Sequence, residues 1–202
     1  LNVIGDKLSF EDGKLTSALS FSEVEKVNVA LDFPSDGTKS LHLVISQNAG
    51  FPKIKIDRRF LENVFANTEA DVLCFEVRAY LAQKAHEGYY EYGEGADYHV
   101  DRFTIQPNQT MTISVKREAL EYLKAGQKTT LDIVILNSDS MNEPFELFLD
   151  NFRGVKQIAE ETTVYVCEGA EFQIEGAKGV MINGTDVTAE TILNSGAYLS
   201  ST

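Results

Sequence analysis

Short segments in which apolar and polar residues alternate recur along most of the chain. The clearest covers residues 144–154, where Phe145, Leu147 and Leu149 fall on one face of an extended segment. Successive side chains of a β-strand point to opposite faces, so this period of two is typical of a strand that lines a core. The same alternation occurs at residues 27–33, 41–46, 73–81, 111–115 and 131–136. Many short strands, each with one apolar and one mixed face, predict an all-β fold: a two-sheet antiparallel β-sandwich of the jelly-roll type.

Helical patterns are few. Residues 59–66 have apolar side chains four positions apart, and residues 116–125 combine good helix formers with Gly126 as a stop signal. Both segments are expected to be short helices between strands. Residues 83–101 show no clear periodicity, so we expect a long polar and aromatic loop there, and loops of this length are often functional.

The pattern changes near residue 158. Beyond it lie Gly-rich turns and short strand-like runs, at residues 163–166, 172–174 and 180–182, with Asn183-Gly184 as a hairpin signal. About forty residues are marginal for an independent domain. We therefore expect a sandwich module over residues 1–158 and, over residues 159–202, a β-rich appendage or the start of a following module.

Composition and charge exclude some classes of function. The chain has 202 residues, enough to bury a core, and its 31 acidic against 18 basic residues give a net charge of −13. Such a charge repels phosphate backbones, so nucleic acid is not an expected partner. No apolar run approaches the ~20 residues of a membrane-spanning helix. Cys74 and Cys167 lie in strand-like runs and are expected to be separate buried thiols, although the sequence leaves a disulfide between them open.

Three short motifs stand in order along the chain: LSFEDG at residues 8–13, DGTKSL at residues 36–41, and a strand ending in LDNFRG at residues 149–154. Together they resemble motifs of the calcium-bearing β-jelly-roll carbohydrate-binding modules, whose sandwich is galactose-binding-like. In that family a structural calcium ties the first strand to the last, and oxygen ligands of this kind suit calcium. The alternative is a solvated turn and a loop cap. The metal ligands implied by the resemblance are the side chains of Glu11 and Asp150 and carbonyls near Gly13, Lys39 and Asp150.

A ligand surface is expected on the mixed face of the strand at residues 73–81. Sugar-binding sandwiches use such a face, with aromatic rings that stack on sugars and polar groups that bind hydroxyls, and concave sites are the usual ligand location. Tryptophan, the commonest sugar platform of the family, is absent. The alternative is an ordinary Glu76–Arg78 ion pair with tyrosines as half-buried loop anchors. The predicted ligand-binding residues are Glu76, Arg78 and Tyr80 on the strand, with Tyr89, Tyr90, Tyr92, Tyr98 and Arg102 as a wall or lid.

Enzymatic motifs are missing. The three histidines lie apart, no nucleophile elbow, zinc-protease helix or P-loop occurs, and the Glu-x-Asp-x-x-Glu strand of jelly-roll hydrolases is not found. A lyase set of Tyr92, His99 and Arg102 lacks the lyase motifs around it. We therefore predict a non-catalytic module that binds a polysaccharide or oligosaccharide and is tethered within a larger secreted or surface glycan-processing protein. A structural or adhesive spacer is the main alternative, and a lyase or hydrolase is a weaker one.

Overall fold

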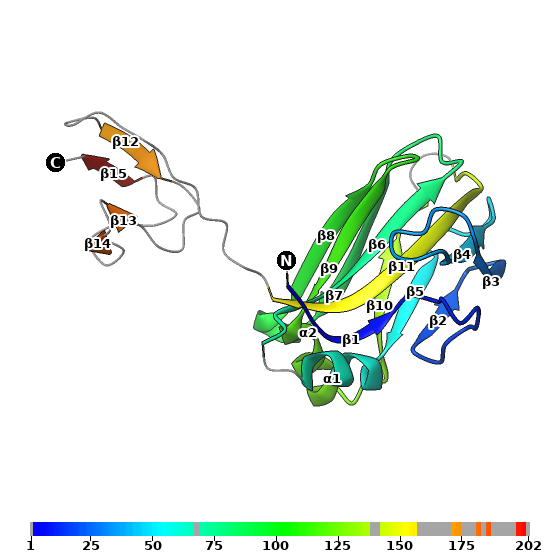
Figure 1. Cartoon of the computed structure of the whole chain (residues 1–202), viewed down its shortest axis with the longest axis horizontal. Coiled ribbons are helices and arrows are strands. Elements are labelled where there is room, and N and C mark those ends of the chain that lie inside the picture. The colour runs from blue at the N-terminus through cyan, green and yellow to red at the C-terminus, as the bar shows by residue number, and fades with distance from the viewer. Residues whose placement is uncertain are drawn as a thin grey trace. The chain divides into compact units, whose positions relative to one another are not determined.

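The computed structural model describes residues 2–66 (2–6 by their backbone), 69–137 and 142–156, and the backbone of four short strands beyond residue 156. The chain divides into two compact units, Leu1–Ile158 and Ala159–Thr202. The first unit consists of two antiparallel sheets packed face to face with two small helices (Figure 1). The predicted all-β sandwich is therefore confirmed.

The first sheet has the strand order β3-β4-β11-β6-β9, with β1 also paired to β11. One edge of β11 pairs with β4 in its first half, where Phe145 faces Ile45, and with β1 in its second half, where Phe152 faces Leu8. β6 runs along the other edge. The segment with the clearest alternation is thus the central strand of the sheet. The six strands are β1 (Asn2–Leu8), β3 (Lys26–Ala30), β4 (Ser40–Ile45), β6 (Val72–Tyr80), β9 (Thr110–Lys116) and β11 (Phe145–Lys156).

The second sheet has the order β2-β5-β10-β7-β8. The expected loop over residues 83–101 is wrong, because most of it forms the hairpin of β7 and β8 around the short 3-10 helix η1 (Gly95–Asp97). Tyr90 and Tyr92 point into the core while Glu91 points out, so the alternation was hidden by aromatic residues with polar ends on the inner face. The five strands are β2 (Leu19–Ser22), β5 (Lys53–Asp57), β7 (His86–Tyr92), β8 (His99–Ile105) and β10 (Thr130–Ile135).

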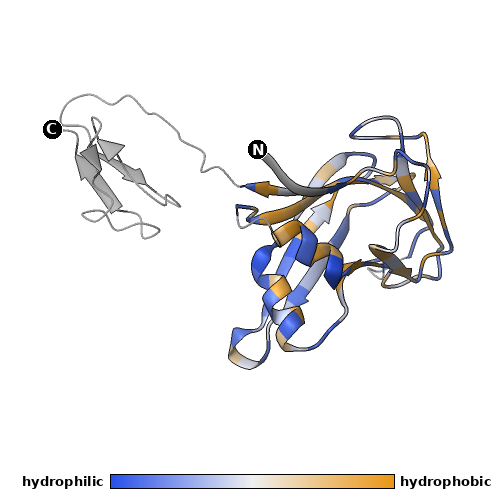
Figure 2. Cartoon of the chain, turned by 60° about the horizontal axis from the view of Figure 1, so that its bottom comes forward, coloured by the Kyte–Doolittle hydropathy of each residue, from blue (hydrophilic) through white to orange (hydrophobic). Residues whose placement is uncertain are grey.

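Two helices form as predicted, α1 (Arg58–Ala66) and α2 (Arg117–Ala125), and lie side by side at one end of the sandwich (Figure 1). Each helix buries one apolar side, which includes Leu61 in α1 and Leu120 in α2. Many of the other residues in both helices are hydrophilic (Figure 2). No helix in the described part of the chain has the length and apolar character needed to cross a membrane.

A bulge in β11 sets which residues reach the core. Asn151 has a φ of 56° and lies where the pairing with β6 shifts, between Asp150 and Arg153. The extra residue turns Phe152 inward, where its ring stacks on Phe75 at 4.5 Å. Cys74 is a buried thiol on the same sheet, whereas Cys167 lies outside the described residues, so their pairing stays untested.

The second unit is β in its described parts. β12 (Glu171–Ile174) pairs with β15 (Ala197–Ser200), and β13 (Met181–Ile182) pairs with β14 (Thr185–Asp186), both antiparallel. The runs expected near residues 172–174 and 180–182 fall in β12 and β13. The run at 163–166 and the Asn183-Gly184 signal lie outside the described residues.

Candidate functional site

A row of side chains crosses five strands on the outer face of the first sheet. Asn28 of β3 faces His42 of β4, which faces Phe148 of β11, which faces Arg78 of β6, which faces Thr110 of β9. Neighbouring strands lie ~4.8 Å apart, so the row is about 19 Å long. This outer-face row has polar groups at both ends and an aromatic centre.

Phe33 covers the middle of the outer-face row. It belongs to the loop at residues 31–39, has a φ of 48° and is 39% exposed. Its ring lies 4.9 Å from that of Tyr80 and 5.0 Å from that of Phe148, and the guanidinium carbon of Arg78 lies 4.4 Å from its centre. The expected continuation of the strand through Leu31 and Phe33 is wrong, because β3 ends at Ala30 and both residues are exposed.

Among the residues that the structure describes, no acidic side chain pairs with Arg78. Glu76 instead binds Arg153, with nitrogen–oxygen distances of 2.8 and 2.9 Å, so the Glu76–Arg78 ion pair considered as an alternative does not form. No hydrogen bond or ion pair reaches the Arg78 side chain among the described residues, and its Nε is buried without an acceptor. A buried donor without an acceptor costs about 1–3 kcal/mol. The guanidinium of Arg78 is therefore suited to donate hydrogen bonds to oxygen atoms of a ligand.

Acceptor groups gather at the other side of the outer-face row. His42 stacks on Phe148 at 4.6 Å, and its Nε2 lies 2.8 Å from a carboxylate oxygen of Glu146. Its Nδ1 lies 3.2 Å from Oδ1 of Asn28. Glu146 also faces Tyr80 across β11 and β6, and its side chain is 28% exposed. The face therefore offers donors at Arg78 and acceptors at Glu146 on either side of an aromatic cluster.

The predicted ligand residues do not form one site. Tyr89 and Arg102 face each other on the second sheet, and the guanidinium carbon of Arg102 lies 5.8 Å from the centre of the Tyr89 ring. Tyr98 is 50% exposed, and its hydroxyl is hydrogen-bonded to the Glu91 side chain. That outer face is on the opposite side of the sandwich from Arg78. The expected cleft, with tyrosines forming a wall over Arg78, is therefore wrong.

Tyr90 and Tyr92 are not available to a ligand, because they are only 2% and 8% exposed. The Tyr90 hydroxyl donates to Asp101 at 2.6 Å and accepts from the Lys116 main-chain N–H at 3.2 Å. Burial and the neighbouring Asp101 carboxylate raise the pKa of Tyr90. Both tyrosines are core residues, which corrects their prediction as part of a ligand wall.

Asp150 holds the middle of the loop at residues 31–39. Its Oδ2 accepts main-chain hydrogen bonds from Ser35 and Asp36 at 2.9 and 2.8 Å, and its Oδ1 accepts from Asn151 at 2.7 Å. Burial raises the pKa of this carboxyl, although the three N–H donors act in the opposite direction.

Glu11 holds the second half of the same loop. Its carboxylate accepts hydrogen bonds from the main-chain N–H groups of Thr38 and Lys39 at 2.9 and 2.8 Å and from the Thr38 hydroxyl at 2.9 Å. These donors hold the pKa of Glu11 below its ordinary value. We call this arrangement, in which Glu11 and Asp150 grip residues 35–39, the loop clamp. The three sequence motifs thus meet at one place.

The residues of the loop clamp do not fit a divalent ion as they are arranged. All four carboxylate oxygens of Glu11 and Asp150 already accept hydrogen bonds from the chain. The ammonium of Lys39 lies 2.7 Å from the main-chain oxygen of Glu11, beside Gly13. In the described ranges no group of three or more His, Cys, Asp or Glu residues could hold a metal. Calcium stays a prediction of the resemblance, and this hydrogen bonding does not favour it.

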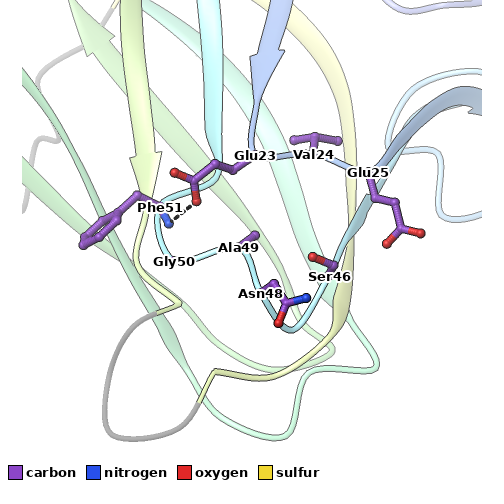
Figure 3. Close-up of a pocket in the computed structure, with 8 residues that line it drawn as sticks. All are labelled: Glu23, Val24, Glu25, Ser46, Asn48, Ala49, Gly50 and Phe51. Carbon is purple, nitrogen blue, oxygen red and sulfur yellow. Dashed lines mark hydrogen bonds between the residues drawn. The ribbon is translucent and has the colours of Figure 1, made fainter.

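A shallow hollow of about 770 Å³ lies elsewhere, between the loops that follow β2 and β4. Its side chains do not converge: the Phe51 ring and the Glu25 carboxylate point in opposite directions (Figure 3). The Glu23 carboxylate already accepts a hydrogen bond from the main-chain N–H of Phe51 at 2.9 Å. We therefore take the outer-face row, and not this hollow, as the candidate site.

No protein-family model and no curated protein matches the sequence. Among solved structures, an exo-β-agarase matches 78% of this chain and 25% of its own, with a TM-score of 0.52 and 10% identity. Other structural neighbours are β-sandwich carbohydrate-binding modules. The CBM22-1 xylan-binding domain from Paenibacillus barcinonensis Xyn10C matches 79% of this chain and all of its own, with a TM-score of 0.44 and 16% identity. TmCBM61, solved with β-1,4-galactotriose, matches 74% and 94%, with a TM-score of 0.41 and 10% identity. The chain spans a quarter of the agarase.

Proposed function

We propose that the chain is a non-catalytic carbohydrate-binding module that binds a polysaccharide or oligosaccharide along the outer-face row. The observation that carries this proposal is Arg78, a half-buried guanidinium that packs on Phe33 and has no acceptor in the described part of the chain. Sugars offer hydroxyl oxygens to such a donor and C–H faces to the rings of Phe33 and Tyr80. Glu146 would accept from hydroxyl groups further along the chain of sugars.

The chain is proposed to work as one module of a larger secreted or cell-surface glycan-processing protein. Support for tethering comes from the shared fold with one quarter of an agarase chain. Placement outside the cytoplasm follows from the proposed ligand, because a binding module is useful only where the polymeric glycan is found.

Affinity electrophoresis of the full chain through gels that contain agarose, xylan or β-1,4-galactan tests the proposal. Wild type is expected to be retarded by at least one polymer, and Arg78→Ala to bind it about 10–100-fold more weakly, because charge-assisted hydrogen bonds contribute about 1.5–3 kcal/mol. Arg102→Ala is the matched control, since it removes an arginine from the opposite sheet. Circular dichroism checks that each variant is folded.

Two results would overturn the sugar site. Equal retardation of wild type and Arg78→Ala would remove the outer-face row from binding. No binding by wild type to any member of a broad glycan array would favour a structural or adhesive spacer, in which the aromatic cluster around Phe33 only supports its loop. New chain ends in any polysaccharide incubated with the protein would show a lyase or hydrolase instead.

A further inference from the structure

Lys39 makes two connections to Glu11. Its main-chain N–H donates to the Glu11 carboxylate at 2.8 Å, and its side-chain ammonium donates to the Glu11 main-chain oxygen at 2.7 Å. A Cβ built on Gly13 would lie 3.5 Å from the same ammonium, so the cation sits against the turn at residues 10–13. The Gly13 N–H closes that turn on the Phe10 oxygen at 2.9 Å. A positive charge thus lies inside the loop clamp, where the N-terminal turn meets residues 35–39.

The negative charges of the loop clamp are compensated by the chain itself. Lys39 contributes to the lowered pKa of Glu11, after the N–H groups and hydroxyl that bind it. Asp36, in the same loop, forms an ion pair with Lys7 of β1. Asp150 receives the main-chain N–H groups of Ser35 and Asp36. Each acid of the clamp therefore has donors or a cation from nearby residues, and none depends on an external ion for a partner.

We propose that the Lys39 ammonium is the cation of the loop clamp and that this sandwich closes its N-terminal turn on residues 35–39 without a divalent ion. The resemblance assigns Lys39 a carbonyl role in metal binding, whereas here the side chain itself supplies the positive charge at the Glu11 oxygen. A bound calcium would have to displace this ammonium and compete with the donors on both carboxylates. This inference is independent of the sugar site.

Thermal unfolding of the full chain, followed by circular dichroism, tests the proposal. Wild type is measured with a chelator and with calcium above the 10⁻⁴–10⁻³ M range of weak extracellular sites. The expected Tm is the same in both, because an ion that does not bind the folded state cannot stabilise it. Lys39→Met, which keeps an apolar stem and removes the charge, is expected to lower the Tm by about 2–4 °C, the shift for one typical interaction in a chain of this size.

Lys14→Met is the matched control, because Lys14 is exposed and its ammonium makes no hydrogen bond or ion pair within the described residues. Its Tm is expected to equal that of wild type. Lys39→Arg, which retains the charge, is expected to lie between wild type and Lys39→Met. A calcium-dependent rise in the wild-type Tm would overturn the proposal, and so would equal Tm values for Lys39→Met and Lys14→Met.

Discussion

Gly37 is the position where a single methyl group would test the loop clamp most directly. Its φ is +73°, and a Cβ added there would lie 2.6 Å from the carboxyl carbon and from one oxygen of Glu11. The end of a glutamate side chain can usually move aside. Here it cannot do so without breaking the hydrogen bonds from Thr38 and Lys39 that fix the loop. Gly37→Ala therefore combines backbone strain with the loss of the Glu11 contacts.

The two contributions can be separated by comparison with other glycines. A left-handed backbone costs a residue with a Cβ about 1–2 kcal/mol, which corresponds to a Tm fall of roughly 2–8 °C in a chain of this size. Gly95 has a φ of +59° with no atom within 4 Å of an added Cβ, so Gly95→Ala measures the strain alone. Gly50 has neither the positive φ nor a close neighbour, so Gly50→Ala is expected to melt like wild type.

The assay is thermal unfolding of the three alanine variants, each made also in a Glu11→Ala background. Gly37→Ala is expected to lower the Tm by more than Gly95→Ala in the wild-type background. With Glu11→Ala the steric conflict is gone, so the two penalties should become similar. The reasoning is refuted if Gly37→Ala is no more harmful than Gly95→Ala, or if its penalty is unchanged when Glu11 is removed.

The N–H groups of Thr38 and Lys39 lower the pKa of Glu11 below 4.5, so its carboxylate stabilises the fold above that pH and loses this effect as the pH falls through the folded-state pKa. The Tm difference between wild type and Glu11→Gln should therefore be largest near neutral pH and shrink in acid, and a constant difference would contradict this. Tyr90→Phe removes the hydroxyl that links Asp101 to Lys116 and should cost about 1–2 kcal/mol in urea unfolding, because a partly buried carboxylate loses a donor. Tyr98→Phe, at an exposed ring, is the control, and equal losses for the two variants would refute the role of Tyr90.

Strands with one purely apolar face could be predicted from the sequence. The sequence indicates β6 clearly, because Glu76 and Arg78 alternate with the core residues Phe75 and Val77. It indicates β11 as well, because Phe145, Leu147 and Leu149 form one continuous apolar face. β7 could not be read, because its inner face is made of His86, Gly88, Tyr90 and Tyr92, which a polarity pattern does not mark as core. The ring nitrogens of His86 and the hydroxyl of Tyr90 find hydrogen-bond partners only in the folded sandwich. The sequence around these residues therefore does not show that they are buried.

The candidate site could be predicted only in part. The sequence indicates Arg78, because its side chain alternates with the core residues on either side of it in β6. The Arg78–Phe148–His42 row could not be found, since the register between strands distant in sequence depends on their pairing. The sequence pattern does not show the role of Phe33, because β3 ends at Ala30 and the positive φ of Phe33 places it in a loop instead of the strand. The sequence also does not show that Tyr89 and Arg78 lie on different sheets, because the sheet that the β7–β8 hairpin joins depends on the topology of the whole fold.

The loop clamp and the outer-face row act through one segment of chain. The loop at residues 31–39 presents Phe33 to Arg78, and within a few residues it is fixed by Asp150 at Ser35 and by Glu11 at Thr38. A bulky residue with a positive φ persists only where its surroundings hold it, and the clamp supplies that restraint. A ring that is already in place reduces the ordering cost of binding. The motif that the resemblance links to a metal therefore also prepares the proposed sugar site, even though its acids point at main-chain N–H groups and not at a ligand.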